Sequence, residues 1–262
     1  MLVFAELKQA FDELGLADKP VIAHASLKKF GTIRGAAKTA TKAMLASFDG
    51  LIMPTFTYKT MITPEVGPPN NGLTYGSGKD INKMAEPFLI DMPPDKMMGS
   101  LPLALLYEKG VLRTSHPILS FAGIRADEIL LSQTLFDPLA PIRELTEKDG
   151  WVVLINVDHS INTSIHYAEK LAGRRQFVRW AMTPERIVEC PGFPGDSTGF
   201  TAIKELVAPN TRRVEVGKEA FIEAVPLKRL IDVTVELIKK EPLALLCQRD
   251  DCERCNAVRN HL

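Results

Sequence analysis

Two apolar strands, with a loop and a helix between them, are predicted for residues 21–53, VIAHASLKKFGTIRGAAKTATKAMLASFDGLIM. The two ends of this stretch, residues 21–23 and 51–53, are apolar at every position. The alanine-rich run 35–48 favours a helix, and the following Asp-Gly pair is typical of a turn. Strands that are apolar throughout belong to sheets covered on both faces. The stretch therefore predicts a β-loop-α-β unit of an α/β sandwich.

The rest of the chain continues this alternation of helix and strand. Residues 3–14 predict a helix with Phe4, Leu7, Phe11 and Leu14 on one face, and 151–155, WVVLI, predict another buried strand. Further helices are expected at 163–171, 201–207 and 226–240. Residues 58–80 are rich in Pro, Gly, Asn and Thr without a period, which is typical of a functional loop or of a disordered insertion. With no convincing boundary, we expect one domain over 1–262.

Composition narrows the class of protein. The chain is 45% hydrophobic and 24% charged, which is ordinary for a globular domain and excludes collagen, coiled coil and disorder. Lys plus Arg and Asp plus Glu both number 32, so net charge does not favour nucleic acid or an anionic membrane. There is no apolar run of about 18 residues, and the first residues mix charge with apolar side chains. We expect a cytoplasmic protein with neither a membrane nor a nucleic-acid partner.

Three cysteines gather in the C-terminal tail, residues 247–262. Cys247, Cys252 and Cys255 form a C-x4-C-x2-C pattern. Thiolates are preferred ligands of zinc, so the pattern is compatible with a structural zinc ion. Because the chain has no second C-x2-C pair, a solvated amphipathic tail with incidental thiols is the other interpretation.

Motifs for nucleotide hydrolysis and serine hydrolysis are incomplete. The Gly-Lys pairs 78–79 and 217–218 lack the other residues of a P-loop. The GDSTG sequence around Ser197 fits the G-x-S-x-G pattern of a nucleophile elbow, but two prolines interrupt the approaching strand. Its downstream partners would be Asp232 and His261. A serine hydrolase using Ser197 is one alternative, and a helix cap at Ser197 is the other.

The loop 26–35, SLKKFGTIRG, lies between the first predicted strand and the helix that follows it. Backbone amides at a helix N-terminus bind anions, and Lys28, Lys29 and Arg34 would add positive charge. The loop therefore predicts a phosphate-binding site, with an ordinary connector carrying solvated cations as the alternative.

A histidine and a glutamate are spaced three residues apart in the predicted helix 163–171. On a helix, His166 and Glu169 share a face, so Glu169 can bond one ring nitrogen and leave the other as a base. A placed general base contributes roughly 10²–10⁴ in rate. Asn162 or Thr163 would cap this helix. The alternative is a solvated pair on an exposed surface, and His24 and His116 are further candidates for the site.

Five motifs occur in a familiar order, and a common acetyltransferase signature, Arg or Gln followed by x-x-G-x-G/A, is absent. The motifs are His24-Ala25-Ser26-Leu27 with Gly31-x-Ile33-x-Gly35-Ala36-Ala37; Met53-Pro54-Thr55-Phe56-Thr57; Arg113-x-Ser115-His116-Pro117 with Ser120; Asp149-Gly150; and Asn162-Thr163-Ser164-Ile165-His166-x-x-Glu169. In this order they resemble the aminoglycoside 3-N-acetyltransferase family, and the likeness extends over roughly residues 20–200, about two-thirds of the chain.

This resemblance implies transfer of an acetyl group from acetyl-coenzyme A to an amine, directly through a tetrahedral intermediate. It also implies a three-layer α/β/α sandwich with a mixed sheet, which is not the common GNAT acetyltransferase fold. By position, His166 would be the general base, Glu169 would orient it, and His24 would face the acyl-transfer centre. A thioester is already activated, so no covalent enzyme nucleophile is required.

The resemblance further implies two groups of cofactor-binding residues. The pyrophosphate and pantetheine arm would contact Ser26, Leu27, Lys28, Gly31, Thr32, Ile33, Arg34, Gly35 and Ala36, and Ser115, His116 and Ser120 would lie along the same cofactor. Ala25 replaces a second serine that is usual in the family, and Ala36 replaces a common second glycine.

The acceptor implied by the resemblance is an aminoglycoside-like amine, which would connect the protein with antibiotic resistance. Such polycations need a pocket rich in carboxylates. Candidate acids are Glu65, Asp80, Glu86, Asp91, Asp95 and Asp196. The alternative acceptor is another small amine, and the protein is expected to be a monomer or a homodimer.

Overall fold

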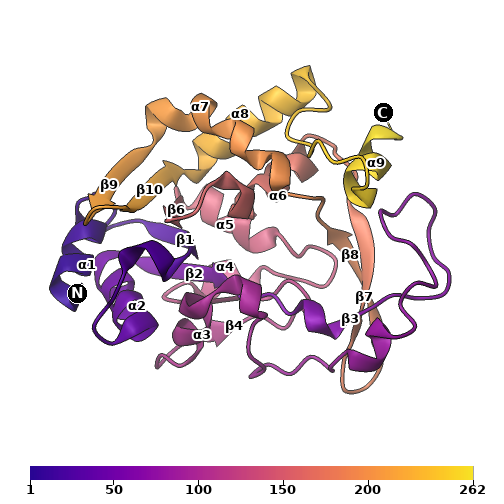
Figure 1. Ribbon diagram of the computed structural model, residues 1–262, viewed down its shortest axis with the longest axis horizontal. Helices are drawn as coiled ribbons and strands as arrows, with labels where there is room; N and C mark the ends of the chain where they lie inside the picture. The colour runs from indigo at the N-terminus through magenta and orange to yellow at the C-terminus, as the bar shows by residue number, and fades with distance from the viewer. Residues whose placement is uncertain (262) are drawn as a thin grey trace.

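The computed structural model describes residues 1–261, built around a seven-stranded sheet with the order β4-β5-β2-β1-β6-β10-β9 (Figure 1). Strand β1 runs parallel to both β2 and β6, and the remaining neighbours are antiparallel, so the sheet is mixed. The strands are β1 (Pro20–Ala25), β2 (Gly50–Pro54), β4 (Leu112–Arg113), β5 (Phe121–Ile124), β6 (Trp151–Ile155), β9 (Arg212–Val216) and β10 (Ala220–Pro226).

Helices cover both faces of this sheet. One face packs on α1 (Phe4–Asp12), α2 (Ala36–Ser47) and α3 (Ser100–Leu106). The other packs on α4 (Asp127–Leu131), α5 (Ala140–Glu147), α6 (Ser164–Leu171) and α8 (Leu227–Lys240). The prediction of a three-layer α/β/α sandwich with a mixed sheet is confirmed.

Two separate cores explain why the central strands are apolar at every position. Ile22 and Val152 belong to the core under α5, α6 and α8, whereas their neighbours Val21 and Val153 belong to the core under α1 and α2. Successive side chains of a strand point to opposite faces, so a strand buried on both sides needs an apolar residue at each step.

A second, three-stranded sheet lies beside the sandwich, with the order β3-β7-β8. It consists of β3 (Met61–Ile62), β7 (Phe177–Met182) and β8 (Ile187–Phe193). Residues 58–80, which have no hydrophobic period, contribute β3 and then pack on β7. There, Asn71 Oδ1 accepts from the Val178 N–H at 2.9 Å, and Asn71 Nδ2 donates to the Val178 carbonyl at 3.0 Å. Asn70 donates to the Ala257 carbonyl at 3.1 Å, so the segment also contacts the C-terminal tail.

The remaining elements are short. They are α7 (Lys204–Val207), α9 (Glu253–Arg259) and the 3-10 helices η1 (Leu27–Phe30), η2 (Tyr58–Thr60), η3 (Ile81–Met84), η4 (Lys96–Met98), η5 (His159–Ile161), η6 (Thr198–Ile203) and η7 (Ala208–Asn210). The helix expected at 201–207 is thus η6 followed by α7. Within residues 1–261, no helix is both long and apolar enough to cross a membrane. Leu262 of the predicted tail lies outside the described residues.

The apolar face of the first predicted helix is only partly covered. Leu7, Phe11 and Leu14 are buried, whereas Phe4 is 41% exposed. Phe4 is the first residue of α1, and helical periodicity gives the direction of a side chain without showing how far the covering elements extend.

Candidate active site

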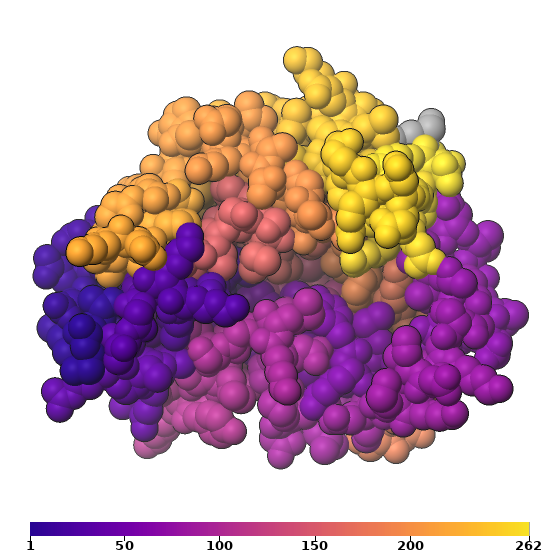
Figure 2. Space-filling view, in the orientation of Figure 1, coloured from indigo at the N-terminus to yellow at the C-terminus, as the bar shows by residue number. Residues whose placement is uncertain are grey.

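A cavity of about 490 Å³ opens beyond the carboxyl ends of the parallel strands β1 and β2. This edge of an α/β sheet is where ligands usually bind. The cavity's lining comes from these strand ends, α3, the η5–α6 region, the β8–η6 loop and α9. Figure 2 shows a depression between the magenta segment near residue 100 and the salmon and orange segments, with the yellow tail at one end.

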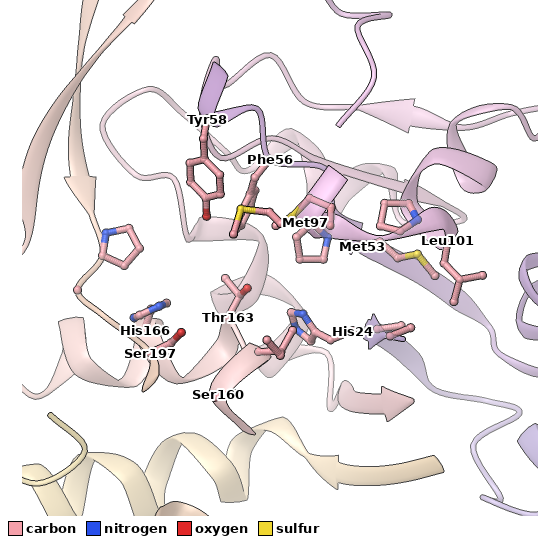
Figure 3. A pocket seen from close by; sticks show the side chains of 18 of the residues that line it. His24, Met53, Phe56, Tyr58, Met97, Leu101, Ser160, Thr163, His166 and Ser197 are labelled. Atoms are coloured by element: carbon pink, nitrogen blue, oxygen red, sulfur yellow. The ribbon is translucent and has the colours of Figure 1, made fainter. Parts of the chain in front are cut away.

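The two ends of the cavity differ in chemistry (Figure 3). Met53, Met97 and Leu101 form an apolar end, and His166 and Ser197 lie at the opposite, polar end. His24 and Thr163 lie between the two ends. The arrangement can hold a flexible apolar chain at one end and a polar molecule at the other.

A chain of three charged or polar side chains reaches the polar end. Glu169 Oε2 lies 2.7 Å from His166 Nδ1, and Arg174 donates to Glu169 Oε1 at 2.7 Å. His166 and Glu169 are 7% and 1% exposed, so the alternative of a solvated surface pair is wrong. His166 lines the cavity, and its Nε2 has no hydrogen bond to any described residue. The imidazole is therefore held at one nitrogen and available at the other.

Local structure explains how these three side chains meet. Thr163 is the N-cap residue of α6 and its side chain makes no capping hydrogen bond, whereas Asn162 Oδ1, one residue earlier, accepts from the Ser164 N–H at 3.1 Å. After the helix ends, Gly173 adopts φ 84°, a left-handed conformation that glycine tolerates, and the Arg174 N–H returns to the Glu169 carbonyl at 2.9 Å. Arg174 is not among the site residues predicted from the sequence, although a glycine just past a helix is the usual signal for such a turn.

The other two candidate histidines are both neutral at physiological pH. Burial lowers the pKa of His24 to about 3, with a smaller contribution from His159, and His24 lines the cavity with its Nε2 unpartnered among the described residues. Burial also lowers the pKa of His116 to about 4. His116 Nδ1 accepts from the N–H groups of Ile118 and Leu119, so its ring stabilises a turn.

The predicted phosphate-binding loop leaves the cavity at the end of β1. Ala25 lines the cavity, but none of Ser26, Leu27, Lys28, Gly31, Thr32, Ile33, Arg34, Gly35 and Ala36 does. Lys28, Lys29 and Arg34 are exposed and have no carboxylate partner among residues 1–261. Ala36 adopts φ 50°, a left-handed conformation that favours glycine.

The second group of predicted cofactor residues is also absent from the cavity lining. Ser115 is exposed, whereas Ser120 is fully buried and its hydroxyl donates to the Thr55 carbonyl at 2.8 Å. Arg113 Nε donates to the same hydroxyl at 3.2 Å. Neither Ser115, His116 nor Ser120 lines the cavity. In this structure Ser120 joins the end of β2 to β5.

Ser197 lines the polar end near His166 (Figure 3). Its loop passes close to Glu169, because a Cβ on Gly195 would lie 3.9 Å from Glu169 Oε2. Ser197 has φ −98° and ψ −2°, without the strained turn of a nucleophile elbow. Of the expected partners, Asp232 pairs with Lys228 at 2.9 Å and His261 lines a different pocket. The hydrolase constellation is not assembled.

The permanently charged side chains on the cavity wall are arginines. None of the candidate acids Glu65, Asp80, Glu86, Asp91, Asp95 and Asp196 lines it, and among the described residues the lining holds no carboxylate. Arg179 and Arg254 contribute to the polar end. Arg179 is 3% exposed and donates to the carbonyls of Asn71, Gly72 and Val178. Burial and the nearby Arg254 charge lower its pKa to about 10, which leaves it charged at neutral pH.

The three tail cysteines come together with a fourth residue. The ligand atoms of Asp196, Cys247, Cys252 and Cys255 all lie within 4.8 Å of one another, and all four residues are buried. Asp196 belongs to the β8–η6 loop, far from the cysteines in sequence, so no spacing pattern could have indicated it. Neither Cys190 nor His261 belongs to this group.

Comparisons with known proteins show the family of this chain. Residues 22–239 match the profile of a family described as aminoglycoside 3-N-acetyltransferase. Aminoglycoside N(3)-acetyltransferase IV from Salmonella sp is 36% identical over 66 residues, which span 24% of this chain and 25% of that protein. The match thus spans about a quarter of the length of this relative.

Solved structures share the fold. The apoenzyme of aminoglycoside acetyltransferase AAC(3)-IVa superposes with a TM-score of 0.78 at 22% identity, covering 100% of this chain and 98% of that one. The YokD protein from Bacillus subtilis gives 0.78 at 19% identity, covering 92% and 100%. Because the profile match spans most of the chain, this protein belongs to the aminoglycoside 3-N-acetyltransferase family, a family of acyltransferases.

Proposed function

We propose that the protein transfers an acetyl group from acetyl-coenzyme A to an amine, with His166 as the general base. The observation that carries this proposal is the buried chain from Arg174 through Glu169 to His166, which ends on the cavity wall. A base within such a cavity can take a proton from an amine bound beside it.

The residues fit acetyl-coenzyme A. This cosubstrate supplies an acyl group that is already activated as a thioester. The apolar end, with Met53, Met97 and Leu101, suits the pantetheine arm, and the exposed cations Lys28, Lys29 and Arg34 suit the phosphates. A solved relative, AAC-IIIb, was determined with coenzyme A (CoASH), which supports the same cosubstrate here.

In this proposal, residues of the chain accept one proton from the amine and stabilise the negative charge that develops on the acyl oxygen. His166 Nε2 takes the proton of the attacking amine, while Glu169 holds Nδ1 and stabilises the imidazolium that results. Arg174 offsets the charge of the buried Glu169. His24 stays neutral and can donate a hydrogen bond from its ring to negative charge that develops on the acyl oxygen.

Two classes of acceptor have separate support. Crystal structures of AAC(3)-IVa in complex with a gentamicin and with apramycin support an aminoglycoside amine. The wall itself supports a different small amine, one that carries a negative charge. Arg179 and Arg254 line it and no carboxylate does so within residues 1–261, and Arg179, unlike Arg254, which lies 3.4 Å from Asp196, has no carboxylate partner among these residues. Like charges held together in a partly enclosed site are unfavourable, so this wall disfavours a polycation.

A matched set of acceptors tests the proposal. Coenzyme A release from acetyl-coenzyme A is measured with gentamicin, apramycin, glucosamine and glucosamine 6-phosphate. We expect kcat/KM for glucosamine 6-phosphate to exceed that for glucosamine at least about tenfold, since one charge-assisted contact is worth roughly 1.5–3 kcal/mol. Arg254→Met should remove this preference, and Arg186→Met, which changes an exposed arginine, should keep it. Acetylation of gentamicin and apramycin alone would establish the aminoglycoside acceptor instead.

A further inference from the structure

We propose that Asp196, Cys247, Cys252 and Cys255 bind one structural zinc ion, and that this ion holds the C-terminal tail against the polar end of the cavity. The first support is distance. In a tetrahedral site with Zn–S bonds of about 2.3 Å, neighbouring sulfur atoms are about 3.8 Å apart. The four ligand atoms here all lie within 4.8 Å of one another, so small side-chain adjustments complete the tetrahedron.

The second support is the chemistry of the ligand set. Three thiolates select a soft or borderline metal and disfavour magnesium and calcium, which bind oxygen ligands. Carboxylate oxygen is also a regular ligand of zinc. All three cysteines are free and at most 7% exposed, and an odd number of thiols cannot be satisfied by disulfides within the group.

The third support is charge. Three thiolates and one carboxylate carry four negative charges, so a bound zinc ion leaves the group with two. Arg249 lies 2.9 Å and Arg254 3.4 Å from Asp196 Oδ2, and these two cations offset the remainder. Without its metal ion, the group would bury three thiols, which are weak hydrogen-bond donors, beside a carboxylate that already accepts from Thr198, Arg249 and Arg254.

The ion would have a structural role. Four protein ligands fill a tetrahedral site and leave no open position for water or substrate, which is the arrangement of structural zinc. The ligands come from three segments: the β8–η6 loop gives Asp196, the segment after α8 gives Cys247, and the start of α9 gives Cys252 and Cys255. The ion therefore ties the end of the chain to a loop more than fifty residues upstream.

The position of the ion connects it with the cavity. Gly195 and Ser197 flank Asp196 and line the polar end, and Arg254, beside Cys255, also lines it. Arg254 donates to the Gly195 carbonyl at 3.0 Å, so the tail and the loop form one wall. Zinc binding would fix this wall next to His166; this last step rests on the proposed acetyl transfer, whereas zinc binding does not.

Metal analysis of the full chain tests the proposal. The protein is produced in zinc-supplemented medium, purified without chelator, and analysed for zinc, iron and copper. We expect about one zinc per chain in the wild type and in Cys190→Ser, whose buried thiol lies outside the group. Cys252→Ser and Cys255→Ser should each lose most of the zinc. Asp196→Asn should bind zinc with an affinity at least about tenfold lower, measured by competition with a chelator.

A second measurement covers variants that fail to fold. Cobalt added to chelator-treated wild-type protein should give the thiolate-to-cobalt absorption of a tetrahedral sulfur-rich site, and zinc should abolish it in equimolar amount. Chelator should also lower the unfolding midpoint of the wild type, and readded zinc should restore it. Wild-type protein without zinc and without the cobalt spectrum, a site filled by iron or copper, or Cys252→Ser and Cys255→Ser proteins that keep their zinc would overturn the proposal. None of these readouts depends on acetyl transfer, so the two proposals can fail separately.

Discussion

Two polar clusters meet at one end of the cavity, and they differ in how the chain builds them. His166, Glu169 and Arg174 lie within nine residues of sequence and are joined by two hydrogen bonds of 2.7 Å. Asp196, Cys247, Cys252 and Cys255 come from three distant segments. The first cluster presents an unoccupied ring nitrogen to the cavity, and the second is enclosed. In the two proposals made above, the first cluster therefore acts on the rate of reaction and the second on the stability of the wall.

The sharpest way to separate the two clusters is to remove the base. We expect His166→Ala to lower kcat at least about a hundredfold, because a placed general base contributes roughly 10²–10⁴. The shift of the unfolding midpoint by acetyl-coenzyme A should persist, and so should the zinc content. Steady-state kinetics combined with thermal unfolding checks this, and an unchanged kcat would remove His166 from the mechanism.

A smaller effect on rate, with a cost in stability, is expected for Glu169→Gln. Loss of the carboxylate leaves Arg174 buried without a charged partner, and breaking such a pair costs about 3–5 kcal/mol. As a positioning residue that holds His166 Nδ1, Glu169 should act on kcat, so KM for the amine should change little. Denaturant unfolding and steady-state kinetics measure the two effects. Glu147→Gln, a change at an exposed acid, is the control; equal kcat values for the two variants would contradict the role.

The buried histidine between the two ends predicts a loss of stability in acid. The folded-state pKa of His24 is about 3, below its ordinary value of 6.5, so the unfolded chain binds the extra proton first as the pH falls. The contribution of neutral His24 to the free energy of unfolding is fully present above pH 6.5 and is lost as the pH falls toward 3. Between pH 7 and pH 5, His24 alone should cost about 2 kcal/mol. Unfolding of His24→Gln should depend less steeply on pH over this range, and an identical slope would contradict the burial effect.

The mildest expected change is at the predicted phosphate-binding loop. Lys28→Ala and Arg34→Ala should each raise KM for acetyl-coenzyme A several-fold with little change in kcat, because exposed charge contacts are individually weak. The increase should shrink at high salt. Lys240→Ala, which changes an exposed lysine at the end of α8, serves as the matched control. An effect on kcat alone would place the phosphates elsewhere.

The contrast between a cluster built within one helix and a cluster built from distant segments also explains what could be predicted from the sequence. Spacing within one helix predicted the contact of His166 with Glu169, and uniformly apolar strands such as 151–155 predicted a sheet covered on both faces. These features depend on a local period. Asp196 and Arg179 could not be predicted to lie where they do, because their neighbours are set by loops that cross the fold. For the same reason, the six candidate acids could be named but not placed, and none lines the cavity.

The central claim is tested most directly by following acetyl-coenzyme A and the acceptor together by mass spectrometry, in the wild type, His166→Ala and Ser197→Ala. The account predicts that the wild type consumes acetyl-coenzyme A only when an amine is present and forms an equal amount of N-acetylated product. Ser197→Ala should retain this reaction and His166→Ala should lose it. Consumption without an amine, with release of acetate that Ser197→Ala abolishes, would contradict the account and identify a hydrolase.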